Sequence, residues 1–298
     1  MSSTSEKLFK LMMLNELLAS FTHVKPWISK LCRIVNMRAN GVLELFLDNL
    51  KESMSVKIIT GFPIVQEDVV HPDVDGIAGS LVLAEALAQI GCKVEVLAEP
   101  YCLSVLKELA LHTHISSASI KNVGYLPSIK GDLAIFVEKP GANPLGVYHN
   151  AHGEDISSFC FHVEKYMKNF DLKASIGDLG NEVGFGVVYQ EIKPYVKYGA
   201  HCLCRCKAGI IASYKVDFLI TSTTSNIGSY VLAAAISITK NEVFLHDAHR
   251  EELFIMKAIK LGAVDAFASS NFSVDGLDVR TCKTFVSQLS KICKSNLR

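Results

Sequence analysis

Acidic and amide side chains recur in five separate segments of the sequence, each where a predicted strand ends or a loop turns. In chain order they are Asp73 and Asp75, Glu138, Asp178 with Asn181 and Glu182, Ser225 with Asn226, and Asp275 with Asp278. Ligands in open α/β sheets gather beyond the carboxyl ends of the strands, so we expect these side chains to converge. Carboxylates brought together in this way repel one another unless some hold a proton or a cation neutralises them.

The chemistry that suits such side chains is the binding of a hard divalent cation. Carboxylate and amide oxygens, together with water, are the ligands of Mg²⁺, Mn²⁺ or Ca²⁺ rather than of zinc or copper. We therefore predict a divalent-metal cofactor, Mg²⁺ or Mn²⁺ with Ca²⁺ as the alternative. The predicted metal ligands are Asp73, Asp75, Asp178, Glu182 and Asp275.

Two of these segments also have a purely structural interpretation. Asp73 and Asp75 precede a predicted helix, where an aspartate caps the first turn well. The segment 177–186 is harder to explain as a turn, because it packs four glycines and three polar side chains into ten residues. Glycines of this kind let the backbone approach a ligand closely. The segment lacks the Gly-Lys-Ser/Thr ending of a phosphate-binding P-loop.

The elements that must position these side chains alternate between strands and helices after a helical start. Apolar periodicity and breaker residues predict an α/β fold with a largely parallel or mixed sheet flanked by helices. Strands are predicted at 56–64, 92–99, 132–139, 173–177 and 216–223, and helices at 77–91, 101–111, 158–170, 226–240, 246–261 and 279–294. Helices at 6–20, 26–36 and 42–52 form an N-terminal lead-in. We expect two parts, a lead-in over 1–52 and an α/β domain over 53–298.

The composition narrows the class of protein. The 298 residues are 49% hydrophobic and 20% charged, which is typical of a globular chain. Lys and Arg together equal Asp and Glu at 30 each, so no basic excess favours nucleic acid or an anionic membrane. We predict a small-molecule substrate, no nucleic-acid or membrane partner, and leave a homo-oligomer open. The sequence offers no clear signal peptide and no apolar run of the roughly 18 residues that span a bilayer, which favours a cytoplasmic location.

The cysteines and histidines give weaker signals. An odd number of cysteines, nine, without a Cys-x-x-Cys pair favours a reducing compartment and does not indicate a structural zinc site. Cys202, Cys204 and Cys206 alternate, would share one face of a strand, and are interpreted as packing residues. His246 and His249 are spaced to share a face of a predicted helix, with ordinary surface or capping roles favoured over metal binding. No Gly-x-Ser-x-Gly segment anchors a hydrolase triad.

Taken in order, several motifs resemble those of the D-glutamate cyclase C-terminal domain family. They are Gly61-Phe62-Pro63, Asp75-Gly76 with Gly79, Val137-Glu138-Lys139-Pro140-Gly141, Tyr148-His149-Asn150, the 177–186 segment, Ser225-Asn226-Ile227-Gly228 and Val274-Asp275-Gly276. The resemblance spans about residues 36–280, and the 177–186 segment is its most specific part. It implies an α/β fold and a cytosolic or mitochondrial enzyme. Animal members resemble a mitochondrial enzyme that converts D-glutamate to 5-oxo-D-proline and water, and they carry an additional N-terminal domain. Archaeal members stand alone and have been regarded as metal-binding proteins with an acidic cavity, and this chain resembles that type.

Four motifs depart from the family pattern, at five positions that are expected to line the pocket. Ile77 and Ala78 replace two prolines, Lys139 replaces an arginine, Leu179 replaces a glycine and Ile227 replaces a tryptophan. An arginine binds a carboxylate through two parallel hydrogen bonds, whereas a lysine is a point charge. The predicted metal ligands of the family pattern are all present in this sequence. We therefore expect these differences to affect which substrate is bound.

The resemblance and the acidic segments together predict a lyase that cyclises D-glutamate, or a related small carboxylate, with metal assistance. Glu138, Asp178 and Glu182 are the predicted catalytic residues, with Glu138 transferring protons and the other two holding the metal. The predicted substrate-binding residues are Lys139, Asn150, Asn181, Ser225 and Asn226. Two alternatives remain open on the same residues: a metal-dependent small-molecule phosphatase and a non-catalytic protein that binds a metal or metabolite.

Overall fold

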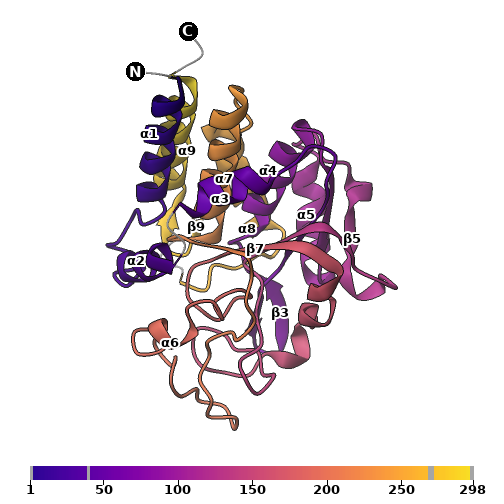
Figure 1. Cartoon of the computed structure of the whole chain (residues 1–298). Coiled ribbons are helices and arrows are strands. Elements are labelled where there is room, and N and C mark those ends of the chain that lie inside the picture. The colour runs from indigo at the N-terminus through magenta and orange to yellow at the C-terminus, as the bar shows by residue number, and fades with distance from the viewer. Residues whose placement is uncertain (1–2, 39–40, 268–271, 296–298) are drawn as a thin grey trace.

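A six-stranded parallel sheet flanked by helices forms the framework of the fold (Figure 1). The computed structural model describes residues 3–38, 41–267 and 272–295. The strand order is β5-β4-β1-β6-β7-β8. The bounds are β1 Ser55–Thr60, β4 Lys93–Ala98, β5 Ile120–Asn122, β6 Gly131–Val137, β7 Phe170–Gly177 and β8 Phe218–Thr221. The predicted α/β class with a parallel sheet is therefore confirmed.

The register aligns the carboxyl ends of the central strands. Thr60 at the end of β1 pairs with Val137 at the end of β6, which in turn pairs with Ile176 of β7. On the other side of β1 the chain runs outward through β4 and β5, so the strand order reverses between β1 and β6. Such a switch point opens a crevice beyond the strand ends, where ligands of α/β proteins bind.

Two buried helices fix the floor of this crevice. Helix α4 (Ile77–Gln89) is apolar on nearly every side, and it packs against α7 (Ser225–Lys240). A side chain at Gly79 would place its Cβ 2.9 Å from the Cα of Asn226, so the glycine permits the close approach of the two helices. The remaining helices around the sheet are α5 Pro100–Ala110, α8 Ala248–Lys260 and α9 Val279–Lys294.

The N-terminal lead-in docks on the edge of the sheet formed by β8. It consists of α1 (Ser3–Leu17), α2 (Ile28–Arg38) and α3 (Val42–Asn49), and its apolar side chains join the main hydrophobic core. Helix α1 packs against α7, whereas α2 and α3 contact β8. The backbone N–H of Thr223 donates to the carbonyl of Leu18 at 3.0 Å, which ties the turn after α1 to the end of β8.

The chain between β6 and β8 is largely irregular, and it forms the loop-rich part of the molecule below the sheet in Figure 1. It includes the one-turn helix α6 (Tyr189–Ile192). The predicted helix at 158–170 is wrong, because this stretch forms two 3₁₀ segments, Ser157–Phe159 and Val163–Asn169, before β7 begins. Short 3₁₀ turns allow the chain to follow an irregular path without the four-residue hydrogen bonds of an α-helix.

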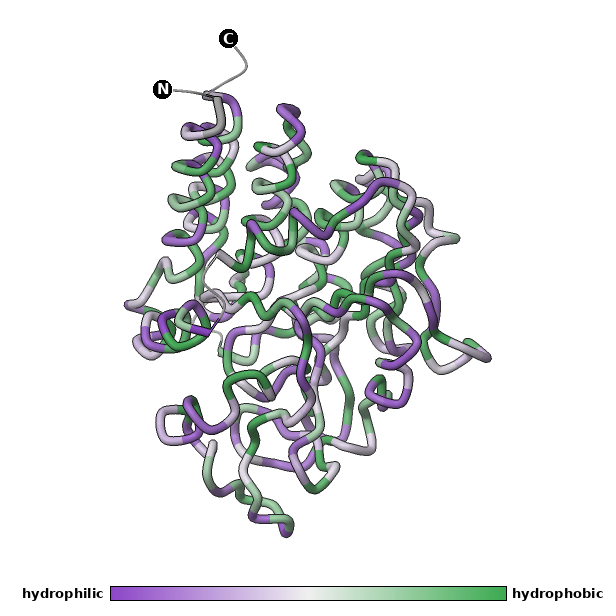
Figure 2. The backbone as a smooth tube through the Cα atoms, viewed as in Figure 1, coloured by the Kyte–Doolittle hydropathy of each residue, from purple (hydrophilic) through white to green (hydrophobic). Residues whose placement is uncertain are grey.

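Smaller elements complete the described chain. Hairpin β2 (Pro63–Gln66) and β3 (Val69–Pro72) follows β1, and a two-residue pair, β9 (Ser273–Val274) and β10 (Leu277–Asp278), precedes α9. Short 3₁₀ segments at Ser117–Ser119 and Val123–Tyr125 flank β5. Figure 2 shows hydrophilic and hydrophobic residues alternating along the outer helices, as expected of helices with one face on the core. Within the described chain, every helix is too short or too polar to cross a bilayer.

Candidate active site

Six carboxylates from distant segments are buried together beyond the ends of β1, β6 and β7. They are Asp73, Asp75, Glu138, Asp178, Glu182 and Asp275. Oxygens of Asp75, Asp178 and Asp275 lie within 4.8 Å of one another, and so do oxygens of Glu138, Asp178 and Glu182. Asp178 belongs to both groups and is therefore the centre of the cluster.

Sequence reasoning missed a lysine at the heart of this cluster. Lys25 lies in the turn between α1 and α2, and its Nζ forms ion pairs with Asp178 and, at 2.6 Å, with Asp275. The side chain is almost fully buried. Burial by itself lowers the pKa of Lys25, but the charges of Asp178 and Asp275 raise it well above its ordinary value. Lys25 is therefore a permanent positive charge inside the acidic cluster.

Asp75 and Asn226 hold the first turns of α4 and α7 together by exchanging hydrogen bonds. The backbone N–H groups of Ser225 and Asn226 donate to the carboxylate of Asp75 at 2.6 and 2.8 Å. In return, the N–H groups of Gly76 and Gly79 donate to Oδ1 of Asn226 at 3.1 and 2.7 Å. Asp75 thus accepts the free backbone N–H groups at the N-terminus of α7. The capping interpretation of the sequence had placed it instead at the N-terminus of α4, the helix that follows it in the chain.

Glu138 has an unusual backbone conformation directly after β6. Its φ of 43° lies in the left-handed region, which is uncommon for a residue with a side chain. A Cβ at Gly76 would lie 2.4 Å from the Cβ of Glu138, so the loop after β3 can pass there only as glycine. The hydroxyl of Ser225 donates to Oε2 of Glu138 at 2.7 Å. These contacts aim the Glu138 carboxyl at the crevice, whose lining it joins.

Glu182 organises the loop that carries Asp178. Its carboxylate accepts hydrogen bonds from the backbone N–H groups of Asp178 and Leu179, both at 3.0 Å, and of Gly180 at 2.7 Å. These bonds fix the position of Asp178. Asp265 has a comparable role for the last loop, because it accepts the N–H of Gly276 at 3.0 Å, next to Asp275.

The electrostatics of the cluster reflect an excess of negative charge in a dry site. Burial, followed by the charges of neighbouring carboxylates, raises the pKa of Glu138 well above its ordinary value. The pKa of Asp73 rises well above its ordinary value for the same reasons. Burial raises the pKa of Asp178 to about 7, although Lys25 opposes the shift, and burial with the charge of Asp275 raises the pKa of Asp75 to about 7. The cluster therefore holds protons near neutral pH.

A cavity of about 170 Å³ opens onto this cluster. Six of the predicted site residues line it: Asp73, Glu138, Asn150, Asp178, Asn181 and Asp275. Phe62 and Phe267 add apolar walls. Asn181 donates its amide to the carbonyl of His149 at 2.9 Å, and among the described residues its Oδ1 is buried without a partner. That oxygen is available to a donor on a ligand.

Five predicted site residues lie outside the cavity lining: Asp75, Lys139, Glu182, Ser225 and Asn226. Lys139 is fully buried and its ammonium forms an ion pair with Glu99. The position of Lys139 therefore does not support the expectation that it offsets a substrate's charge, because the carboxylate of Glu99 already neutralises its ammonium group. Asn150 reaches the cavity, but its side chain mainly closes a turn by accepting from His152 and Glu154.

Most positions that depart from the family pattern do not line the cavity. Leu179 lines it, as expected, whereas Lys139, Ile77, Ala78 and Ile227 do not. The expectation that His246 and His249 share one face of a helix is wrong. His246 lies before α8 rather than on it, and its Nε2 is 2.7 Å from Glu251 in the buried interior.

The donor set of the cluster fits a hard divalent cation. Its ligand atoms are carboxylate oxygens in two overlapping groups, and burial of so many carboxylates raises their pKa values. A dication beside Lys25 would relieve the same repulsion that keeps these groups protonated. The described structure thus contains groups able to hold a metal ion.

Comparison with known sequences assigns a family. The sequence model of the family described as "D-glutamate cyclase-like, C-terminal" matches residues 29–290, which is most of the chain. The chain belongs to this family. The matched span begins after Lys25, so the lysine at the centre of the cluster comes from outside the region that the family model covers.

Two individual comparisons are more distant. The chain is 23% identical over 216 residues to the protein named "D-glutamate cyclase, mitochondrial" of Homo sapiens, which covers 64% of this chain and 34% of the human protein. The chain therefore spans about a third of the length of that relative. Among solved structures, RecJ of Thermus thermophilus, crystallised in complex with Mn²⁺, overlaps 85% of this chain and 37% of its own. The identity is 9% and the TM-score 0.33, a likeness too slight to support any inference.

Proposed function

We propose that this protein is a D-glutamate cyclase-like lyase that converts D-glutamate, or a closely related small amino-dicarboxylate, to its five-membered lactam and water. The observation that carries the proposal is the enclosed carboxylate cluster around Asp178, found at the switch point of the sheet in a member of this family. The substrate identity follows from the family and from the distant human relative, and it is our inference.

The cavity has a size and charge that suit such a substrate. Its volume of about 170 Å³ is below the roughly 300–1,000 Å³ typical of sites for drug-sized ligands, which favours a small metabolite. The acidic lining attracts the substrate's ammonium group, and Oδ1 of Asn181 can accept one of its hydrogen bonds. Lys25 already pairs with Asp178 and Asp275, so it lowers the net negative charge that the cluster presents to the substrate's carboxylates.

Ring closure requires a base for the amine and an acid for the departing oxygen. The neutral amine attacks the side-chain carboxyl carbon and a C–N bond forms. The nitrogen then gives a second proton to the departing oxygen, and the C–O bond breaks as that oxygen takes one more proton from the acid and leaves as water. We assign the acid role to Glu138, because burial and the neighbouring carboxylates raise its pKa and so favour its protonated form. Asp178, with a pKa of about 7, suits the base that takes a proton from the ammonium.

Asp75, Asp178 and Asp275, with Glu182, are the residues that would hold a divalent cation, for which we propose Mg²⁺ or Mn²⁺, with Ca²⁺ as the alternative. When bound, the cation supplies Lewis-acid polarisation of a carboxyl oxygen. Asp75 joins the N-termini of α4 and α7 by its hydrogen bonds. Glu182 keeps Asp178 in register through the backbone of its own loop. Both residues therefore position the site whether or not they contact the substrate.

We also propose a cytoplasmic location. The nine cysteines are free and most of them are buried, which supports a reducing compartment over an oxidising one. Expression with a fluorescent tag and microscopy would test it, and fluorescence in mitochondria or outside the cell would contradict it.

The function is tested by incubating the purified protein with D-glutamate and Mg²⁺ or Mn²⁺ and following 5-oxo-D-proline by chiral chromatography. L-glutamate and a generic phosphate ester run in parallel. We expect product from D-glutamate, and its loss in Asp178→Asn. The matched control is Glu108→Gln, which removes an exposed carboxylate paired with Lys257.

Product from the ester with none from D-glutamate would contradict the proposal and favour a phosphatase. Tight binding of D-glutamate by calorimetry without any turnover would also contradict it, and would favour a binding protein. Activity that is unchanged in Asp178→Asn would remove the assigned site even if a cyclase activity were found.

A further inference from the structure

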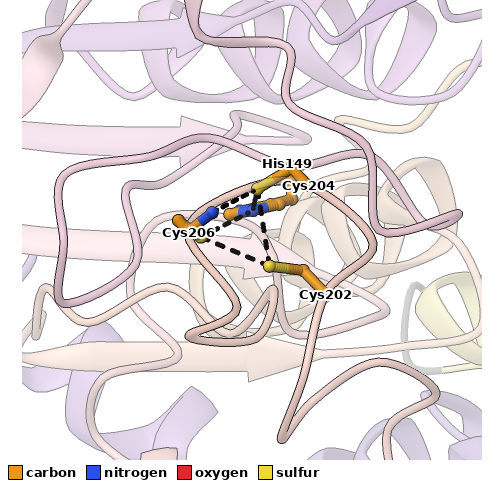
Figure 3. A group of neighbouring side chains, drawn as sticks. All are labelled: His149, Cys202, Cys204 and Cys206. Carbon is orange, nitrogen blue, oxygen red and sulfur yellow. Dashed lines mark hydrogen bonds between the residues drawn. The ribbon is translucent and has the colours of Figure 1, made fainter.

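A second group of metal-type ligands lies behind the wall of the acidic cavity. His149 and three cysteines, Cys202, Cys204 and Cys206, point toward one another from two irregular segments (Figure 3). One ligand atom of each lies within 4.8 Å of all the others. The cysteines are therefore not on one face of a strand, as their alternation suggested, because the chain from 200 to 214 forms turns instead.

The distances between the ligand atoms approach those of a tetrahedral zinc site. Nε2 of His149 lies 3.3 Å from Sγ of Cys204 and 3.5 Å from Sγ of Cys206. Sγ of Cys202 lies 3.5 Å and 3.2 Å from the same two sulfurs. Zn–S bonds of about 2.3 Å and a Zn–N bond of about 2.0 Å at tetrahedral angles place such atoms roughly 3.5–3.8 Å apart, so a slight expansion would admit the ion.

The surroundings of the sulfurs are suited to thiolates. The backbone N–H of Cys206 donates to Sγ of Cys204, and the side-chain amide of Asn143 donates to Sγ of Cys206, both at 3.4 Å. Three thiols this close cannot all ionise unless a cation joins them.

We propose that His149, Cys202, Cys204 and Cys206 bind one structural Zn²⁺ ion. A set of three sulfurs and one imidazole nitrogen is a closed zinc site, and it differs in kind from the carboxylate cluster, which suits harder cations. The four ligands fill a tetrahedral shell, so this ion has no open position for a substrate. It therefore stabilises structure rather than performing chemistry.

The zinc ion would brace the wall of the acidic cavity. The N–H groups of Leu203 and Cys204 donate to the carbonyl of Gly153, which ties the cysteine turn to the 149–154 turn. Asn150 and His152 in that turn line the cavity. The carbonyl of His149 accepts the amide of Asn181, which also lines it. A metal at His149 thus fixes the loop whose other face touches the substrate.

The first test is elemental analysis of the purified 298-residue chain, produced without an affinity tag that binds metals. We expect about one zinc per chain. In Cys204→Ser and Cys206→Ser we expect zinc content to fall by ~10-fold or more. The matched control Cys92→Ser, a cysteine outside the cluster, should retain the wild-type content. Asp178→Asn should retain it as well, which separates this site from the carboxylate cluster.

A second measurement needs no variant, in case the substitutions prevent folding. An organomercurial reagent is titrated into the wild-type protein while a zinc indicator dye reports released ion. We expect one zinc equivalent to be released as three thiols react. Wild-type protein that contains no zinc, or that contains iron instead, would overturn the proposal. A disulfide found between Cys202 and Cys206 by peptide mapping of freshly purified protein would overturn it too.

Discussion

The carboxylate cluster and the cysteine–histidine cluster lie on two sides of the same loop, yet they are built in opposite ways. The first gathers its ligands beyond the carboxyl ends of the parallel strands. Glu138, Asp178 and Glu182 follow β6 and β7 directly, whereas Asp73, Asp75 and Asp275 reach the same place from other loops. The second draws its ligands from turns, and its geometry depends on a few backbone hydrogen bonds. The comparison teaches that the sheet topology assembles the carboxylate site, whereas a bound zinc ion would make the adjoining loop rigid.

The largest expected effect separates the two clusters by activity. Glu138→Gln keeps the shape of the side chain but removes the acid, so we expect kcat for D-glutamate cyclisation to fall by about 10³-fold, within the range for general acids. Zinc content should not change. Steady-state kinetics with elemental analysis measure both, and equal activity in Glu138→Gln and the surface control Glu108→Gln would contradict the assignment.

The next effect concerns the buried charge of Lys25. Lys25→Met leaves Asp178 and Asp275 without their partner, and we expect a loss of about 3–5 kcal/mol in the free energy of unfolding. Adding Asp275→Asn to this variant should recover part of the loss. Denaturant unfolding measures it, with Lys51→Met, an exposed lysine, as control. A loss in Lys25→Met no larger than in the control would show that the ion pairs contribute little.

A smaller effect should appear as a pH dependence of the carboxylate cluster. The folded-state pKa of Asp178 is about 7 against an ordinary 3.8, so the unfolded chain ionises first. This group therefore costs no stability below about pH 4, and its cost grows as the pH rises to about 7, reaching a few kcal/mol.

The unfolding free energy of wild type minus that of Asp178→Asn isolates this contribution. Without added divalent metal, the difference should become more unfavourable to wild type as the pH rises from about 4 to about 7. Added Mg²⁺ or Mn²⁺ should flatten or reverse the trend. A difference that improves with pH in the absence of metal would contradict the raised pKa.

The smallest effect concerns the hydrogen bond that joins the two clusters. Asn181→Ala removes the donor to the His149 carbonyl, for which we expect a loss of about 1 kcal/mol in stability and a raised KM. Zinc should remain bound. Thermal unfolding and kinetics measure these changes, and Asn49→Ala, which removes an exposed amide-to-carbonyl bond, is the control. An unchanged KM would mean that Asn181 does not contact the substrate.

Much of the fold and part of the site follow from sequence patterns. Strand-ending motifs predicted that Asp75, Glu138 and Asp178 would converge, because a parallel sheet leaves their loops no other edge. The role of Glu182 as the acceptor of three backbone N–H groups was not predictable, since a sequence pattern shows a carboxylate but not its donors. The ion pair of Lys139 was not predictable either, because its partner Glu99 follows a different strand, β4.

The residues that were missed have no periodic signal. Lys25 lies in a turn, outside any apolar stripe, so nothing in its neighbourhood marks it as buried. The cysteines were interpreted as packing residues because free cysteines are commonly buried, and because no Cys-x-x-Cys pair indicated a zinc site. One signal could have indicated the site. Three closely spaced cysteines need a fourth zinc ligand, and His149, which belongs to one of the family motifs, is a candidate for it.

The position of Lys25 bears on how the chain folds. It lies 153 residues from Asp178 and 250 residues from Asp275 in the sequence, so its ion pairs close two very long loops. Contacts of such long range form late, after shorter-range structure has limited the search. Until they form, the acidic residues around Asp178 keep protons or water. We therefore expect the turn that carries Lys25 to close over these acidic residues among the last events of folding. This closure would exclude water from the carboxylate cluster.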